Sequence, residues 1–241
     1  MKSAHRTSSR VLVVASHPDD EVIGCGGAIA RHALTGDTVH VMILGEGATS
    51  RNDERGSARE KMELQRLSHA AKKAGKILGV QSLSMHGLPD NRMDSVDLLN
   101  VVKMIEEQIH LFQPDSVYTH HGGDLNIDHR LTHEAVITAC RPVPGASVMQ
   151  ILFFETASST EWQSPGTSPV FEPNWFVDIT DTLALKLKAM RAYAPEVRLF
   201  PHPRSLEAIR HLSGWRGATA GVKAAEAFML GRKVLRANGV K

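Results

Sequence analysis

Short apolar runs alternate with amphipathic segments along the first 155 residues of the chain. The first run, at residues 11–15, is typical of a strand that is buried on both faces of a parallel sheet. The pattern predicts strands at 11–15, 38–44, 82–85, 116–119 and 150–154. It predicts helices at 21–35, at 94–112 and at 129–140, and a long helical segment that follows the polar stretch 45–59 and ends near residue 79. This order is typical of a doubly wound, Rossmann-like α/β sheet with mostly parallel strands, in which ligands bind beyond the carboxyl ends of the strands.

The pattern changes after residue 155. Residues 155–173 are rich in Ser, Thr, Pro and Gly, which predicts a long surface loop that is either a lid or a loosely ordered connection. We expect a single domain over residues 11–241, with the core sheet at 11–155 and a C-terminal helical and loop extension at 156–241, preceded by a flexible tail at 1–10. Within the extension the pattern predicts an edge strand at 175–179, a helix at 182–193 and a helical region at 205–235, broken near 213–214 and at 217.

The composition argues against some classes of partner and favours one kind of chemistry. The 241 residues are 42% hydrophobic and the formal net charge is only +2, so nucleic acid is not an expected partner. No apolar run approaches the ~20 residues of a membrane span, and we expect no stable membrane insertion. The two cysteines form no CxxC pair, which is typical of a reducing compartment and leads us to expect a cytoplasmic protein. The 13 histidines favour metal or acid-base chemistry.

A dense polar cluster, Ser-His-Pro-Asp-Asp-Glu at residues 16–21, directly follows the first predicted strand. His17 and Asp20 are three residues apart across a turn fixed by Pro18, so they could bind the same divalent cation while Asp19 handles a proton. A loop that merely caps a helix needs only one acidic residue, and the cluster therefore favours a metal site. Glycines inside the helix that follows are expected to allow close packing on the sheet, and they are Gly24, Gly26 and Gly27.

A second cluster, at residues 120–133, follows the fourth predicted strand. His129 and His133 are four residues apart on a predicted helix and could face the same side. Asp128 could cap that helix or orient an imidazole ring. Two histidines with one carboxylate are typical of a catalytic zinc site that keeps open positions for water and substrate.

Together the two clusters resemble the motifs of the PIG-L/LmbE-like deacetylases. The first is similar to the family's Ala-His-Pro-Asp-Asp-Glu, and Asn-Ile-Asp-His at 126–129 resembles its His-x-Asp-His motif, with a matching Ala-Val-x-x-Ala at 135–139. Members of the family are zinc-dependent hydrolases that remove the acetyl group from N-acetylglucosamine-type sugars on a Rossmann-like sheet. The resemblance implies Zn²⁺ ligands at His17, Asp20 and His129, with Asp19 as the general base toward a zinc-activated water.

The second motif departs from the family at Asn126, where relatives often have histidine. Asn126 could still donate a hydrogen bond to an oxyanion, while His120, His121 or His133 could supply the acid, and the sequence leaves this choice open. Our expected catalytic set is completed by Asn126 and His133. The expected substrate contacts are Arg51, Asp90, His120, His202 and Arg204, of which Arg51 and Asp90 rest on a loose match to the family.

His202 and Arg204 belong to a third cluster, Phe-Pro-His-Pro-Arg-Ser at 200–205. It is either a proline-rich turn with Ser205 as a helix cap or a binding site for an anionic substituent of the sugar. The expected partner is an N-acetylated amino sugar or its conjugate, and a homo-oligomer is left open. Two alternatives also stay open: a zinc amidase acting on another N-acyl sugar conjugate, of the mycothiol or bacillithiol type, and a non-catalytic sugar-binding homologue.

Overall fold

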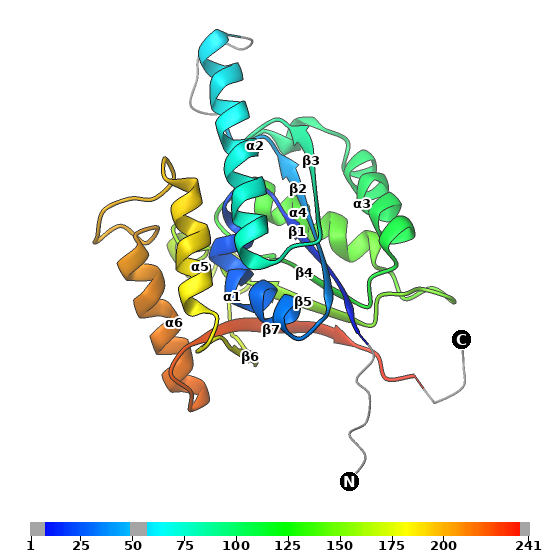
Figure 1. The fold of residues 1–241 in the computed structure, drawn as a ribbon. Helices are drawn as coiled ribbons and strands as arrows, with labels where there is room; N and C mark the ends of the chain where they lie inside the picture. Colours follow the sequence, from blue (N-terminus) through cyan, green and yellow to red (C-terminus); the bar gives the residue numbers. More distant parts are fainter. Residues whose placement is uncertain (1–7, 49–56, 237–241) are drawn as a thin grey trace.

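The computed structural model describes residues 8–48 and 57–236, which form a layered α/β structure around one seven-stranded sheet (Figure 1). The strand order is β3-β2-β1-β4-β5-β7-β6. The first five strands pair in parallel, as the sequence predicts, and the pairs of β7 are antiparallel. The strands are β1 (Arg10–Ala15), β2 (Thr38–Gly45), β3 (Ser82–Leu88), β4 (Ser116–His120), β5 (Gln150–Phe154), β6 (Trp175–Asp178) and β7 (Ala225–Lys233).

Helices cover both faces of this sheet, and its apolar strands supply two separate cores. In β1, Val11 and Val13 belong to one core, whereas Leu12 and Val14 belong to the other. This alternation explains why the strand has no polar face. The first core is closed by α1 (Asp20–Leu34), α2 (Ala58–Leu78), α5 (Leu183–Met190) and α6 (Leu206–Ala220), and the second by α3 (Leu98–Phe112) and α4 (Ile127–Ala139).

The C-terminal part corrects three expectations. The predicted helical region at 205–235 is wrong beyond Ala220, because β7 occupies 225–233 and lies between β5 and β6. Two strands of the sheet thus come from beyond residue 155, so the core sheet is not confined to 11–155. The helix that precedes β7 is continuous through 213–217 and ends at Ala220, and the cap residue Gly221 has a φ of 73°, which suits glycine. Residues 225–233 contain several good helix formers, and only their pairing with β5 and β6 makes them a strand.

The helix α1 is kinked at Cys25, where φ is −145°. Its glycines pack as expected: a Cβ on Gly24 would collide with the Phe154 ring, and one on Gly27 would lie 2.7 Å from Ile179. Glu226 of β7 accepts hydrogen bonds from the amides of Gly27 (2.8 Å) and Ala28 (2.7 Å), which replaces the helical bonds that the kink removes. Contacts from β7 therefore fix the helix whose first turn carries Asp20.

Within residues 8–48 and 57–236, no helix combines the length and apolar character that crossing a bilayer requires. Both cysteines are buried and carry free thiols.

Candidate metal centre and active site

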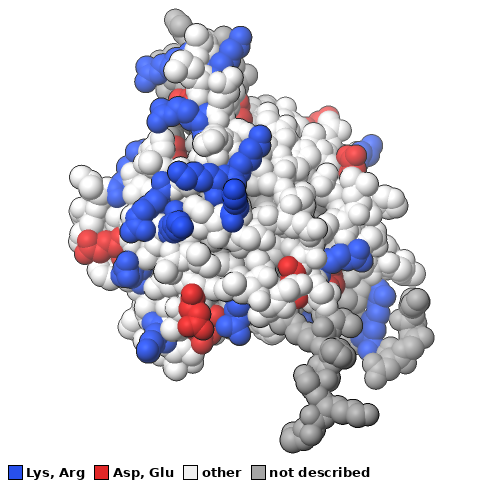
Figure 2. All heavy atoms as spheres, viewed as in Figure 1, with Lys and Arg blue, Asp and Glu red and all other residues white. Residues whose placement is uncertain are grey.

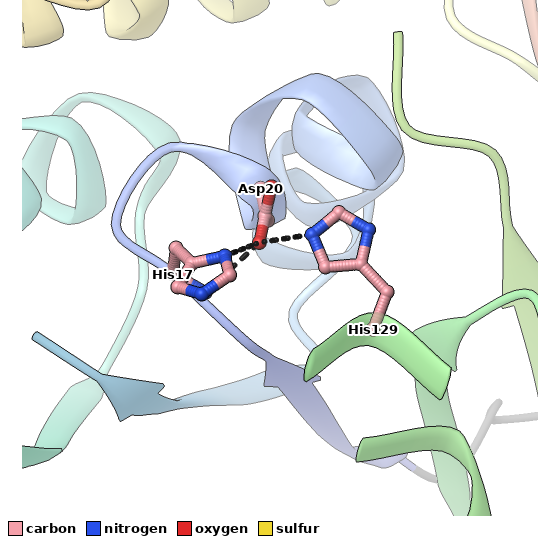
Figure 3. Close-up of side chains that lie close together, drawn as sticks. All are labelled: His17, Asp20 and His129. Atoms are coloured by element: carbon pink, nitrogen blue, oxygen red, sulfur yellow. Dashed lines mark hydrogen bonds and ion pairs between the residues drawn. The ribbon is translucent and has the colours of Figure 1, made fainter. Parts of the chain in front are cut away.

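Three potential metal ligands meet beyond the carboxyl ends of β1 and β4, which are neighbours in the sheet. His17 lies in the loop after β1, Asp20 begins α1, and His129 lies in the first turn of α4. Asp20 Oδ2 is 3.4 Å from His17 Nδ1 and 3.3 Å from His129 Nε2, and both rings point toward it (Figure 3). The parallel topology thus brings together two motifs that are more than 100 residues apart.

The atoms of this group fit a divalent cation. Asp20 Oδ1 is buried and has no hydrogen-bond partner within the described part of the chain, and His129 Nε2, equally buried, has only the 3.3 Å contact with Asp20 Oδ2. A buried polar atom without a partner is costly, and a cation would satisfy both. Two imidazoles with one carboxylate are a donor set that suits Zn²⁺ and leaves room for a fourth ligand.

Each histidine is backed by a second carboxylate. Asp128 Oδ2 is 2.9 Å from His17 Nε2, and Asp124 Oδ1 is 3.0 Å from His129 Nδ1. Metal-binding histidines usually direct their second nitrogen at such a group, which fixes the ring and its tautomer. The sequence suggests Asp128 as a helix cap or an orienting group, and the structure places it against His17. Sequence reasoning missed Asp124, whose only signal was its position inside the cluster at 120–133.

The two carboxylates that contact the histidine rings, Asp128 and Asp124, are themselves fixed by hydrogen bonds. Asp128 accepts hydrogen bonds from the amides of Asn91 (2.7 Å) and Met93 (3.0 Å), and Asp124 accepts from the hydroxyls of Ser159 and Thr160. The loop before α3 and the segment after β5 therefore support this candidate metal site. His17, Asp90 and Asp128 also lie close enough to hold a cation, but the bonds that Asp128 accepts assign it a supporting role.

The electrostatics of the group are those of a site prepared for a cation. Burial lowers the pKa of His17, but hydrogen bonds with Asp128 and Asp20 outweigh it and raise the pKa to about 10. Burial also lowers the pKa of His129, but the charge of Asp20, with hydrogen bonds to Asp124 and Asp20, outweighs it and raises this pKa to about 9. Burial raises the pKa of Asp20, but the charge of His129 and hydrogen bonds from both histidines hold it well below its usual range. Without a metal, the two rings hold protons in the place of a cation.

Asp19 lies beside this group in a strained conformation. Its φ of 107° falls in the left-handed region, which is costly for a residue other than glycine and common at functional sites. The Asp19 amide donates to Glu21 Oε2 (3.1 Å), and Glu21 Oε1 accepts from the Tyr193 hydroxyl (2.6 Å). Burial raises the pKa of Asp19 well above its usual range, while the charge of Arg204 opposes the rise. A carboxylate with a raised pKa can accept a proton near neutral pH.

The third cluster does reach the site. Arg204 Nη1 lies 3.3 Å from Asp19 Oδ2 and 3.7 Å from Glu196 Oε2, and its Nε donates to Ser158 Oγ (2.7 Å). Ser205 caps α6 by accepting from Ala208 N (3.0 Å), as expected of a proline-rich turn, while Arg204 of the same turn faces Asp19.

Three further substrate contacts are expected, at His202, Asp90 and Arg51, and the structure describes the first two. His202 Nδ1 accepts from the Arg204 amide (3.1 Å), and its ring packs edge-on to Trp162, with centroids 5.9 Å apart. Asp90 is buried, with Oδ1 3.2 Å from His17 Nε2. Arg51 lies outside the described residues.

The remaining expected residues have mainly structural contacts. Asn126 caps α4 through its side-chain oxygen and donates from Nδ2 to Asn91 Oδ1 (2.8 Å). His120 is fully buried, and its Nε2 accepts from the Ser16 amide (2.9 Å) while Nδ1 lies 3.2 Å from the Thr156 hydroxyl. This burial does not support the expected sugar contact of His120.

Two more histidines that could supply the acid are also engaged. His133 Nδ1 lies 2.9 Å from the His120 carbonyl oxygen, and the ring packs on Phe153. His121 Nε2 lies 2.9 Å from the Pro169 carbonyl oxygen, in the loop after β5. This loop, expected as a lid or a loose connection, is thus tied to the cluster at 120–133.

Comparisons with known proteins identify the family that this sequence resembles. Residues 12–140 match the PIG-L family model, described as GlcNAc-PI de-N-acetylase. The chain is 31% identical to the diacetylchitobiose deacetylase of Thermococcus kodakarensis over 193 residues, which cover 76% of this chain and 68% of the relative.

Solved structures share the fold. The N,N'-diacetylchitobiose deacetylase of Pyrococcus horikoshii superposes with a TM-score of 0.74 at 23% identity, covering 92% of this chain and 84% of that one. The 4-carboxy-2-hydroxymuconate hydratase of Pseudomonas putida KT2440 gives a TM-score of 0.73 at 23% identity, covering 95% and 99%. The fold therefore carries more than one chemistry, and the family match rests on the sequence: this chain belongs to the PIG-L family.

Proposed function

We propose that this protein is a zinc-dependent hydrolase that removes the N-acetyl group from an N-acetylglucosamine-type sugar or sugar conjugate. The observation that carries the proposal is the buried group of His17, Asp20 and His129 with the carboxylate of Asp19 beside it. The names of relatives, among them a diacetylchitobiose deacetylase, support the reaction and the class of substrate. Two free, buried cysteines are in keeping with a cytoplasmic enzyme.

In this proposal His17, Asp20 and His129 hold Zn²⁺, which supplies Lewis-acid polarisation of the acetamide carbonyl and of water. Asp19 accepts a proton from the attacking water as the new carbon–oxygen bond forms. When the carbon–nitrogen bond breaks, Asp19 returns that proton to the sugar nitrogen, and acetate and the free amine leave. Glu21, which accepts from the Asp19 amide and from the Tyr193 hydroxyl, holds the strained backbone at Asp19, and Arg204 lies against the Asp19 carboxylate.

Asn126 is the proposed donor to the oxyanion. The helix cap and the bond to Asn91 fix the plane of its amide, and a donor of fixed orientation needs little reorganisation in the transition state. The proposed acid is Asp19, because the ring nitrogens of His120, His121 and His133 described above face other groups. Asp90, His202 and Arg204 are the proposed substrate contacts among the described residues.

The test is acetate release from N-acetylglucosamine and its glycosides by zinc-loaded protein. Turnover that is lost in Asp19→Asn, with zinc still bound, supports the proposal. Release of a larger acyl group in preference to acetate would favour an amidase of the mycothiol or bacillithiol type.

A second candidate, a non-catalytic sugar-binding homologue, is favoured by one observation, the asparagine at position 126. Zinc and sugar binding without any release of acetate would support that candidate instead.

A further inference from the structure

Four hydroxyl side chains lie within residues 156–160, shortly after β5. They belong to Thr156, Ser158, Ser159 and Thr160, and we call this stretch the hydroxyl segment. Such a run is typical of an exposed loop, yet Thr156 and Ser159 are buried and the other two are half-buried. Each of the four hydroxyls instead bonds to a side chain at or beside the candidate site.

Ser159 and Thr160 fix the carboxylate of Asp124. The Ser159 hydroxyl donates to Asp124 Oδ1 and the Thr160 hydroxyl donates to Oδ2 (2.5 Å), so each carboxylate oxygen accepts from this segment. Asp124 Oδ1 also lies 3.0 Å from His129 Nδ1. A carboxylate that is held at both oxygens cannot rotate, so the acceptor that orients the His129 ring keeps a fixed direction.

Thr156 supports the same ring through His120. Because His120 Nε2 accepts from the Ser16 amide, its Nδ1 carries the proton and donates to Thr156 Oγ1 (3.2 Å). The His120 ring stacks on the His129 ring, with centroids 4.0 Å apart and planes 20° from parallel. The hydroxyl segment therefore supports the ring of His129 at its edge, through Asp124, and at its face, through His120.

Ser158 holds a different group, the guanidinium of Arg204. Its hydroxyl accepts from Arg204 Nε (2.7 Å), and Arg204 Nη1 lies 3.3 Å from Asp19 Oδ2. Lys and Arg side chains gather on the outer face over α2 and α5 (Figure 2), but water and salt screen such charges, so the cation beside Asp19 needs a contact of its own. The φ of Ser158 is 71°, a conformation that glycine adopts without strain, but glycine would offer Arg204 no hydroxyl.

We propose that the hydroxyl segment positions the two halves of the reaction site separately. Ser159 and Thr160 orient the metal ligand His129, and Ser158 directs the guanidinium that faces Asp19. The inference rests on the proposed function, because that function makes His129 a zinc ligand and Asp19 the base. The three hydroxyl residues act through other side chains and are therefore positioning residues. If the segment served only to complete the fold, its substitution would weaken both halves together.

The variant Ser159→Ala tests the half that binds the metal. It removes one hydroxyl from Asp124, and zinc affinity is expected to fall about tenfold, the lower end of the usual effect of a group that orients a ligand. Competition with a chromophoric chelator measures this affinity without any turnover. Ser158→Gly is expected to keep the zinc affinity of the intact protein. The control Ser164→Ala, at an exposed serine of the same loop, should keep it as well.

The variant Ser158→Gly tests the half at Asp19. It removes the acceptor of a charged donor, and kcat/KM for acetate release at saturating zinc is expected to fall about tenfold. Ser159→Ala is expected to keep the kcat/KM of the intact protein once zinc is saturating. Because glycine suits a φ of 71°, the denaturant midpoint of Ser158→Gly should lie near that of the control Ser164→Gly.

Other results would overturn the inference while acetate release by the intact protein upholds the proposed function. If zinc affinity and kcat/KM fall together in both variants, the two halves are not positioned separately. If only the denaturant midpoints change, the hydroxyl segment has a purely structural role.

If the intact protein releases no acetate, the proposed function fails, and the inference is still tested by zinc affinity and by NMR. The Nε–H signal of Arg204, assigned by its absence in Arg204→Met, is expected to exchange with solvent about tenfold faster in Ser158→Gly. An unchanged exchange rate, or unchanged zinc affinity in Ser159→Ala, rejects the inference.

Discussion

The guanidinium of Arg204 lies 3.3 Å from the carboxylate of Asp19, across a sequence separation of 185 residues. The contact joins the turn before α6 to the loop after β1. It sets a positive charge beside a buried carboxylate whose pKa burial would otherwise raise further. The C-terminal part of the chain thereby adjusts the basicity of a residue from the N-terminal motif.

Replacing Arg204 by Met is expected to raise the pKa of Asp19, because the opposing positive charge is removed. A carboxylate acts as a base only above its pKa, so the acidic limb of the kcat/KM profile should move to higher pH. The measurement is acetate release across pH with zinc saturating. Arg198→Met removes an exposed arginine from the same connecting segment and should leave the limb in place.

Asp19→Asn is expected to lower kcat by a factor of about 10² to 10⁴, the usual contribution of a general base. The side chain keeps its size, and the three metal ligands stay intact, so zinc content should remain that of the unmodified protein. Acetate release and metal analysis on the same sample provide the check. A variant with zinc and full turnover would reject Asp19 as the base.

Zinc binding is expected to release protons. With pKa values near 10 for His17 and 9 for His129, both rings are protonated at pH 7.5 in the metal-free protein, whereas ligands must be neutral. Binding should therefore release about two protons at that pH and fewer as the pH rises through these values. Calorimetric titration in buffers of different ionisation enthalpy measures the number. Release of no protons at pH 7.5 would show that the two rings are already neutral before zinc binds, contrary to these raised pKa values.

Asp124→Asn and Asp128→Asn should each weaken zinc affinity about 10- to 100-fold, because each removes the carboxylate that orients one ligand ring. Competition with a chromophoric chelator gives the affinities. Asp181→Asn, at an exposed position before α5, serves as the matched control. Unchanged affinity in both site variants would reduce these carboxylates to a purely structural role.

Removing one partner of the buried pair Lys186 and Glu226 should destabilise the protein, because the other charge then stays buried without a counter-charge. The two groups are 2.6 Å apart, and Glu226→Gln leaves the Lys186 ammonium without its counter-charge. We expect the free energy of unfolding to fall by about 3 to 5 kcal/mol. Adding Lys186→Met should recover part of that loss in denaturant unfolding. A double variant no more stable than Glu226→Gln would contradict this account.

The sequence by itself determined the five parallel strands of the sheet and pointed to the three proposed metal ligands. Strands such as residues 11–15 are apolar at every position, a property that few environments other than a sheet covered on both faces can accept. The three expected ligands follow from two short motifs. Each motif stands at a strand end, and parallel strands present those ends at one edge.

Tertiary structure decided the rest, because those features depend on contacts between distant parts of the chain. Residues 225–233 are a strand only because β5 and β6 offer them partners. Asp124 and Asp128 are adjacent to or near His129 in sequence, yet only the packing of α4 against the loop after β1 assigns Asp128 to His17. Arg204 reaches Asp19 through a turn whose position no local pattern specifies. Local patterns record which residues must be buried or must carry charge, whereas packing decides which of them meet.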